Sequence, residues 1–223
     1  SSAHINFLPS DDADTLADEG WLRRQSIQFH WHNDDYQSFD DFLASLSSRK
    51  RKNIRKERQS LFDAGVRMLQ LTGTDIKGHH IDDFYRFYMS TIDRKWGGAY
   101  LTRDVFEILK ASMADRMLLV MAEYQGKVIG GALNFIGDDT LYGRNWGCDV
   151  DIPNLHFEAC YYQAIDYAIE NRLSSVEAGA QGFHKVQRGY LPVKTWSVHW
   201  ITHTGFRQAV ARFLAAEERG IDE

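Results

Sequence analysis

The sequence predicts an α/β protein with a mixed, mostly antiparallel sheet that is flanked by helices. Residues 116–124 and 127–136 have the composition of two strands, and Gln125-Gly126 between them is a hairpin turn signal. Residues 139–147 continue as a third strand. A helix expected from about 153 to 172 then leads to a short strand at 174–179. A strand–helix–strand unit of this kind usually pairs its two strands in parallel, which makes the sheet mixed.

The first half of the chain predicts further elements of the same kind. Residues 25–31 alternate polar and apolar side chains, as in a half-buried strand. Ser38 and Asp41 have the spacing of a capping box, so we expect one helix from Ser38 to a stop near Gly65. The remaining expected elements are a strand at 66–73, helices near 81–92 and after Thr102, a strand at 195–203 and a last helix at 205–219.

Composition excludes several classes of protein. The 223 residues are 43% hydrophobic and 26% charged, which is ordinary for a globular protein of one domain or two small ones. No apolar run approaches the roughly 20 residues that span a bilayer, and the first residues lack the features of a signal peptide. Cys148 and Cys160 are the only cysteines, too few for a disulfide framework. We therefore expect a cytoplasmic protein with no membrane span.

Charge is unevenly distributed along the chain. The net charge is −5, yet residues 49–58 contain seven of the 26 basic side chains and one of the 31 acidic ones. A basic segment on an acidic protein typically faces a specific anion, such as phosphate, RNA or a cofactor's diphosphate. A solvated helix face would have the same composition, and charge alone leaves both interpretations open.

Two segments have residue types suited to chemistry. In residues 179–190, the glycines allow close approach of the backbone to a ligand, and His184, Lys185 and Arg188 can all meet an anion. His156 and Glu158 lie in the first turns of the helix expected after 153, although glutamate is favoured there by the helix dipole alone. We expect these segments to meet residues 144–149 where the strands of the sheet diverge. An ordinary charged surface loop is the alternative.

Other sites are not supported. His30 and His32 share a strand face but have no third ligand, so we expect no metal. No nucleophile-elbow, Walker or glycine-rich dinucleotide motif is present. We expect no tightly bound cofactor and no DNA partner.

Several segments resemble the bacterial FemAB-like predicted N-acyltransferases, often described as peptidoglycan biosynthesis or recognition proteins. The resemblance extends over nearly the whole chain, and its most specific blocks are LHFE–CYYQ (155–163) and GAQG–HK–RGY–P (179–192). It implies a GNAT fold and kinship with Fem-type transferases, which move an amino acid from aminoacyl-tRNA onto a peptidoglycan precursor. Family members are longer, with another GNAT-like half upstream. We therefore expect residues 1–223 to be a single GNAT-like acyltransferase domain, the C-terminal half of a tandem protein.

The expected partner of such a half is either the upstream GNAT half or a second copy of the chain. Either would cover an apolar patch, which we expect to include Phe7, Trp21 and Phe29.

The chain departs from the family pattern at three places. Phe183 stands where relatives have glutamate, and Asn145 where they tend to have an aromatic residue. The glycine-rich diphosphate loop of acetyl-CoA-using enzymes is missing between Trp146 and Asn154. That absence favours aminoacyl-tRNA or another acyl carrier over acetyl-CoA as the donor.

The resulting hypothesis is N-acyl transfer, in which an amine attacks an activated ester or thioester and loses a proton to a base. The candidates for the base, in order, are His184, Glu158 and Glu177. The donor, acyl-CoA or aminoacyl-tRNA, is expected to contact Lys185, Arg188, Arg51 and Arg55. The acceptor, a small-molecule or peptidoglycan-precursor amine, is expected to contact His156, Arg144, Trp146 and Tyr190. The alternative is a non-catalytic module that recognises a cell-wall precursor or tRNA, which the missing carboxylate at Phe183 favours.

Overall fold

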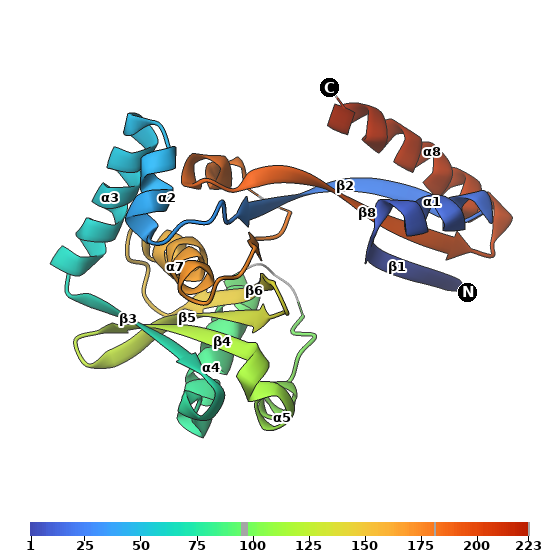
Figure 1. Cartoon of the computed structure of the whole chain (residues 1–223). Helices are drawn as coiled ribbons and strands as arrows, with labels where there is room; N and C mark the ends of the chain where they lie inside the picture. The colour runs from blue at the N-terminus through green and yellow to red at the C-terminus, as the bar shows by residue number, and fades with distance from the viewer. Residues whose placement is uncertain (95–97, 181, 223) are drawn as a thin grey trace. The chain divides into compact units, whose positions relative to one another are not determined.

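The chain forms two compact units in the computed structural model, which describes residues 1–94, 98–180 and 182–222 (Figure 1). The larger unit contains His30–Gly179 and Phe183–Tyr190. The smaller unit contains Ser1–Phe29, Ala180–Gly182 and Leu191–Glu223. The segments singled out by the sequence lie almost entirely in the larger unit.

The larger unit is built on a mixed sheet. Its strands are β3 (Val66–Thr72), β4 (Met117–Tyr124), β5 (Lys127–Ile136), β6 (Thr140–Cys148), β7 (Ser175–Glu177) and the end of β2 (Leu22–His32), adjacent in the order β3-β4-β5-β6-β7-β2. All described pairs are antiparallel except β6 with β7, which is parallel. The β4–β5 hairpin turns at Gln125 and Gly126, both with positive φ. The predicted α/β fold with a mostly antiparallel sheet is confirmed.

Helices cover both faces of this sheet (Figure 1). On one face lie α4 (Gly78–Arg94) and α5 (Arg103–Met113), and on the other lie α7 (Gln163–Glu170), α2 (Phe39–Ser45) and α3 (Ser48–Asp63). Each face of the sheet packs against its own apolar core.

Strand β4 contributes side chains to both cores. The core on the α4 and α5 side includes Ile81, Phe84 and Phe106 of the helices and Met117, Leu119 and Met121 of β4. The core on the other side includes Leu61, Val66, Ala122, Ile129 and Leu155. Successive side chains of a strand point to opposite faces, so the odd-numbered residues of β4 meet one core and Ala122 meets the other.

The single helix expected from Ser38 to Gly65 is two helices, α2 and α3. The predicted cap is present, since Ser38 accepts a hydrogen bond from the backbone N–H of Asp41. The chain becomes extended at Leu46, however, and the Ser47 side chain caps α3 by accepting from the N–H of Lys50. A second serine cap inside the apolar series therefore ends one helix and starts the next.

The helix expected after residue 153 also differs from the prediction. It begins with α6 (Leu155–Phe157), after Asn154 in a left-handed conformation, and continues as a π-helical segment, Glu158–Tyr162, before α7. A π segment inserts an extra residue into a helical turn and is often found at functional sites. We refer to Glu158–Tyr162 as the π segment.

The smaller unit contains β1 (Ser2–Leu8), α1 (Ser10–Asp18), the first part of β2, β8 (Leu191–Ile201) and α8 (Thr204–Asp222). The strand order is β1-β8-β2, and β1 runs antiparallel to β8. Among the described helices, none combines the length and apolar character needed to cross a bilayer.

The apolar patch expected near the start of the chain is present only in part. Phe7 is 67% exposed, Trp21 packs against Trp200, and Phe29 is only 3% exposed. The expectation that Phe29 belongs to an exposed patch is therefore wrong, because its side chain is already buried. An upstream half or a second copy as the partner of this region stays a prediction.

We expect Gly147→Ala to destabilise the larger unit. A Cβ atom at Gly147 of β6 would lie 2.0 Å from the backbone oxygen of Phe87 in α4, far inside van der Waals contact. Because backbone cannot move aside cheaply, the free energy of unfolding should fall by about 3 kcal/mol. Urea denaturation measures the change. Gly78→Ala at the start of α4 meets no atom within 4 Å and is the matched control; equal stabilities for the two variants would contradict the packing described.

Candidate functional site

Two consecutive residues of α3, Glu57 and Arg58, each bind one of the two segments that the sequence singles out. Glu57 accepts from Arg188, with Nε 3.1 Å from Oε2 and Nη2 2.6 Å from Oε1. Arg58 donates to Glu158 in the same bidentate geometry, with Nε 3.1 Å from Oε2 and Nη2 2.9 Å from Oε1. Bidentate arginine–carboxylate pairs fix orientation as well as distance. Helix α3 therefore sets the positions of both the π segment and the 3-10 helix η4 (Phe183–Arg188).

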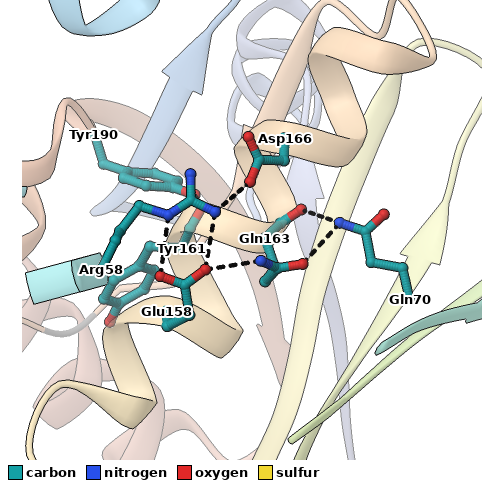
Figure 2. A network of polar contacts seen from close by, with 7 residues as sticks. All are labelled: Arg58, Gln70, Glu158, Tyr161, Gln163, Asp166 and Tyr190. Atoms are coloured by element: carbon teal, nitrogen blue, oxygen red, sulfur yellow. Dashed lines mark hydrogen bonds and ion pairs between the residues drawn. The ribbon is translucent and has the colours of Figure 1, made fainter. Parts of the chain in front are cut away.

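Arg58 is the centre of a polar network on the π segment (Figure 2). Its Nη2 also donates to Asp166 over 2.6 Å, and Gln163 donates to Oε1 of Glu158 over 2.7 Å. Gln70 of β3 extends the network by donating to the side-chain oxygen of Gln163 over 2.9 Å. Burial raises the pKa of Asp166, and the charge of Arg58 opposes that rise. Glu158 is 5% exposed, and both its oxygens already accept hydrogen bonds.

Lys185 and Arg188 are both buried, with exposed fractions of 4% and 7%. Lys185 Nζ donates to the backbone oxygens of Ala178 and Gly179 over 2.5 and 3.2 Å. Burial lowers the pKa of Lys185. Beyond its bond to Glu57, Arg188 donates from Nη1 to the backbone oxygen of His184 over 2.8 Å. Contact between these two side chains and a donor phosphate stays a prediction, and it would require them to leave internal partners.

His184 lies at the start of η4 and is exposed. Its Nε2 is 3.0 Å from the hydroxyl oxygen of Tyr161, and either atom can be the donor, depending on the tautomer. Burial of the ring, followed by the positive charges of Arg188 and Lys185, lowers the pKa of His184 from 6.5. Burial raises the pKa of Tyr161, so that hydroxyl is protonated at neutral pH. His184 is consequently a neutral, accessible imidazole at pH 7.

Aromatic rings gather around His184 from three parts of the larger unit. The ring of His156 in α6 lies 6.3 Å from that of His184 and 5.2 Å from that of Tyr161. Trp146 of β6 lies 5.7 Å from the His156 ring. The structure thus brings together the strand, the helix start and the loop that we expected to meet.

The other predicted acceptor contacts are placed differently. Tyr190 is fully buried and donates to the backbone oxygen of Tyr161 over 3.1 Å, so a substrate could reach its ring only if it were uncovered. Arg144 is exposed and is the extra residue in a bulge, since Leu133 pairs with Asn145 and Asn134 with Gly143.

The remaining predicted residues lie in other surroundings. Glu177 of β7 is 3.8 Å from His30, and burial raises its pKa. Arg51 donates to three backbone oxygens at the end of α2, and Arg55 pairs with Asp40 over 2.8 Å. No described contact joins Glu177, Arg51 or Arg55 to His184. Their catalytic and donor-binding roles stay predictions.

Sequence patterns did not mark Glu57, Arg58 or Tyr161 as residues of the site. Glu57 is the one acidic residue in the basic segment 49–58, which is the signal that could have marked it as a partner for a distant cation. Among the described residues, no three His, Cys, Asp or Glu side chains lie close enough together to hold a metal ion.

Comparison with solved structures shows the fold. The C-terminal domain (DUF2156) of a putative lysylphosphatidylglycerol synthetase from Agrobacterium fabrum matches with a TM-score of 0.68 and 10% identity, over 97% of this chain and 72% of that one. L-PGS from Bacillus licheniformis matches with a TM-score of 0.65 and 9% identity, over 95% and 72%. FemX matches with a TM-score of 0.64 and 12% identity, over 94% and 74%. These identities are too low to indicate shared activity.

Comparison of sequences gives the family. No curated protein matches the chain. The model of the FemAB-like family, described as peptidoglycan biosynthesis/recognition, matches residues 1–223. The resemblance expected from the 155–163 and 179–192 blocks is confirmed, and the chain belongs to the FemAB-like family of peptidoglycan biosynthesis/recognition proteins.

Proposed function

We propose that the protein transfers an acyl or aminoacyl group to an amine, with His184 as the base. The observation that supports this best is the accessible imidazole of His184, whose pKa is lowered by its surroundings. A general base must be unprotonated at the working pH and must reach the amine. Glu158 is less suited to this role, since Arg58 and Gln163 occupy its oxygens.

The proposed reaction is an aminolysis of an activated ester or thioester. The amine nitrogen attacks the carbonyl carbon of an activated ester or thioester, and a C–N bond forms. The nitrogen loses its proton to His184, and the C–O or C–S bond to the leaving group breaks. The imidazolium then gives the proton to the departing oxygen or sulfur.

The donor in this proposal is aminoacyl-tRNA or an acyl-CoA, and the acceptor is an amine of a peptidoglycan precursor. Membership in a peptidoglycan biosynthesis/recognition family supports the acceptor. A cytoplasmic location, as expected from the sequence, goes with either donor.

A non-catalytic binding module is the second candidate. It is favoured by Phe183, which is 83% exposed next to His184 where the family pattern has glutamate. It is also favoured by the partners of Lys185 and Arg188, which bind the backbone of Ala178 and the carboxylate of Glu57 inside the protein. The two candidates predict different results. The enzyme transfers an acyl group at a rate that depends on His184, whereas the binding module transfers none.

We expect His184→Ala to lower the rate of acyl transfer by about 10²–10⁴-fold, because a general base contributes that much. In the unchanged protein, the rate should rise with pH through the lowered pKa of His184 and stay level above it, since only the neutral ring accepts a proton. Transfer of a labelled amino acid from aminoacyl-tRNA to a precursor amine measures both. His79→Ala, at an exposed histidine of α4, is the control. Equal rates for the two variants would remove His184 from the chemistry.

We expect Glu57→Gln to lower the pKa of His184 further. Glu57 neutralises Arg188, whose charge already acts to lower that pKa, so losing the carboxylate leaves Arg188 uncompensated. NMR titration of the His184 ring measures the change without requiring a substrate. Glu123→Gln, which breaks the exposed pair with Arg67, should leave the ring unaffected. A His184 pKa that is the same in all three proteins would show that Glu57 does not act on this ring.

A further inference from the structure

One side of helix α3 presents three exposed cations. Arg49, Lys52 and Lys56 follow one another at intervals of three and four residues, so their side chains project from the same face of the helix. They span about 10 Å along the helix axis. The charged group of none of them has a partner in the part of the chain that the structure describes. We call these three residues the cationic face of α3.

The other basic residues of α3 are already engaged inside the protein. Lys50 Nζ donates to the backbone oxygen of Val186 in η4 over 3.0 Å, and Arg51 donates to three backbone oxygens at the end of α2. Arg55 and Arg58 pair with carboxylates. The basic segment therefore divides into residues that bind the protein itself and a face that does not.

The cationic face is unfavourable for the helix that carries it. Lys52 has a like-charged neighbour one turn away on each side, and such pairs destabilise a helix. Cations in the first turn also oppose the helix dipole, and that turn contains no acidic residue. Exposed arginines elsewhere in the larger unit, such as Arg67 and Arg116, pair with carboxylates instead. A charge pattern that weakens its own helix without an internal contact indicates a partner outside the chain.

We propose that the cationic face of α3 binds the phosphate backbone of a base-paired RNA stem. Three cations spread over about 10 Å match a row of phosphates better than a single phosphate group. The Debye length at physiological salt is of similar size, so the three charges act together on a nearby polyanion. Acidic residues farther away on the protein are largely screened at the same salt concentration.

Other polyanionic partners fit this face less well. A helix that lies on a membrane surface needs an apolar face next to its cations, whereas the exposed residues on this face beside the cations include Asn53 and Ser60, both polar. A single-stranded nucleic acid is held by aromatic rings on which its bases stack, and this face of α3 has none. Amide and hydroxyl groups bind phosphate and sugar oxygens. The face therefore suits the backbone of a helical stem.

This inference rests on the proposed function, because it selects between the two donors. A base-paired stem belongs to aminoacyl-tRNA and is absent from acyl-CoA. Helix α3 also touches the 3-10 helix that contains His184, through the contact of Lys50 with Val186. Lys185 and Arg188, which the sequence suggested for the donor, keep their internal partners in this arrangement.

The test uses fluorescence anisotropy of a short labelled RNA duplex, which carries no acyl group and requires no reaction. One triple variant, Arg49→Gln with Lys52→Gln and Lys56→Gln, removes the cationic face. We expect it to bind at least about tenfold more weakly near 0.1 M salt, and the slope of log Kd against log salt concentration to fall by about three, since each cation displaces about one counterion. A control triple variant removes the same charge from exposed positions elsewhere, and its slope should stay nearly unchanged: Lys127→Gln, Arg172→Gln and Arg212→Gln.

Thermal melting separates a loss of binding from a loss of folding. Removing like charges from α3 should leave the Tm unchanged or raise it. No binding of the duplex by the unchanged protein, or equal losses in the two triple variants, would overturn the proposal. Binding to phosphatidylglycerol vesicles but not to RNA would overturn it in favour of a membrane. His184→Ala should bind the duplex normally, so the role of His184 in the reaction and the role of α3 in binding RNA can fail separately.

Discussion

The two bidentate pairs made by Glu57 and Arg58 are the interaction on which the candidate site depends. Adjacent residues of one helix have opposite charges, and each meets its complement on a different segment, Arg188 in η4 and Glu158 in the π segment. Removing one partner of a buried ion pair costs about 3–5 kcal/mol, because the other charge stays behind without compensation. The order of charges on α3 therefore fixes which segment lies on which side of it.

This arrangement separates charges that maintain the structure from a group that is available for chemistry. Lys185 and Arg188 stay inside and bind protein oxygens. Burial lowers the pKa of His184, and the positive charges of these two residues lower it further. The imidazole itself is exposed beside Tyr161 and His156. In the proposed reaction, the loop that looks suited to phosphate in the sequence would act on proton transfer through these charges, with no requirement that its cations touch a ligand.

Sequence patterns predicted correctly the features that depend on residues close together in the chain. The Gln125-Gly126 turn, the Ser38 cap and the parallel pairing of β6 with β7 depend on neighbours in sequence or on the handedness of connections. The sequence does not predict the ion pair between Glu57 and Arg188. The two residues are 131 positions apart, and many other acidic residues could have been the partner of Arg188. The π segment and the Ser47 cap were also missed, since an inserted residue or a second serine leaves the apolar series nearly unchanged.

A double-mutant cycle on Glu57 and Arg188 tests the central claim most directly. Unfolding free energies would be measured by urea denaturation for the unchanged protein, Glu57→Gln, Arg188→Gln and the double variant. If the pair positions η4 as described, the double variant should be less destabilised than the sum of the single changes, by at least about 1 kcal/mol. Additive effects would show that the two side chains act independently and would contradict the account of how α3 positions His184.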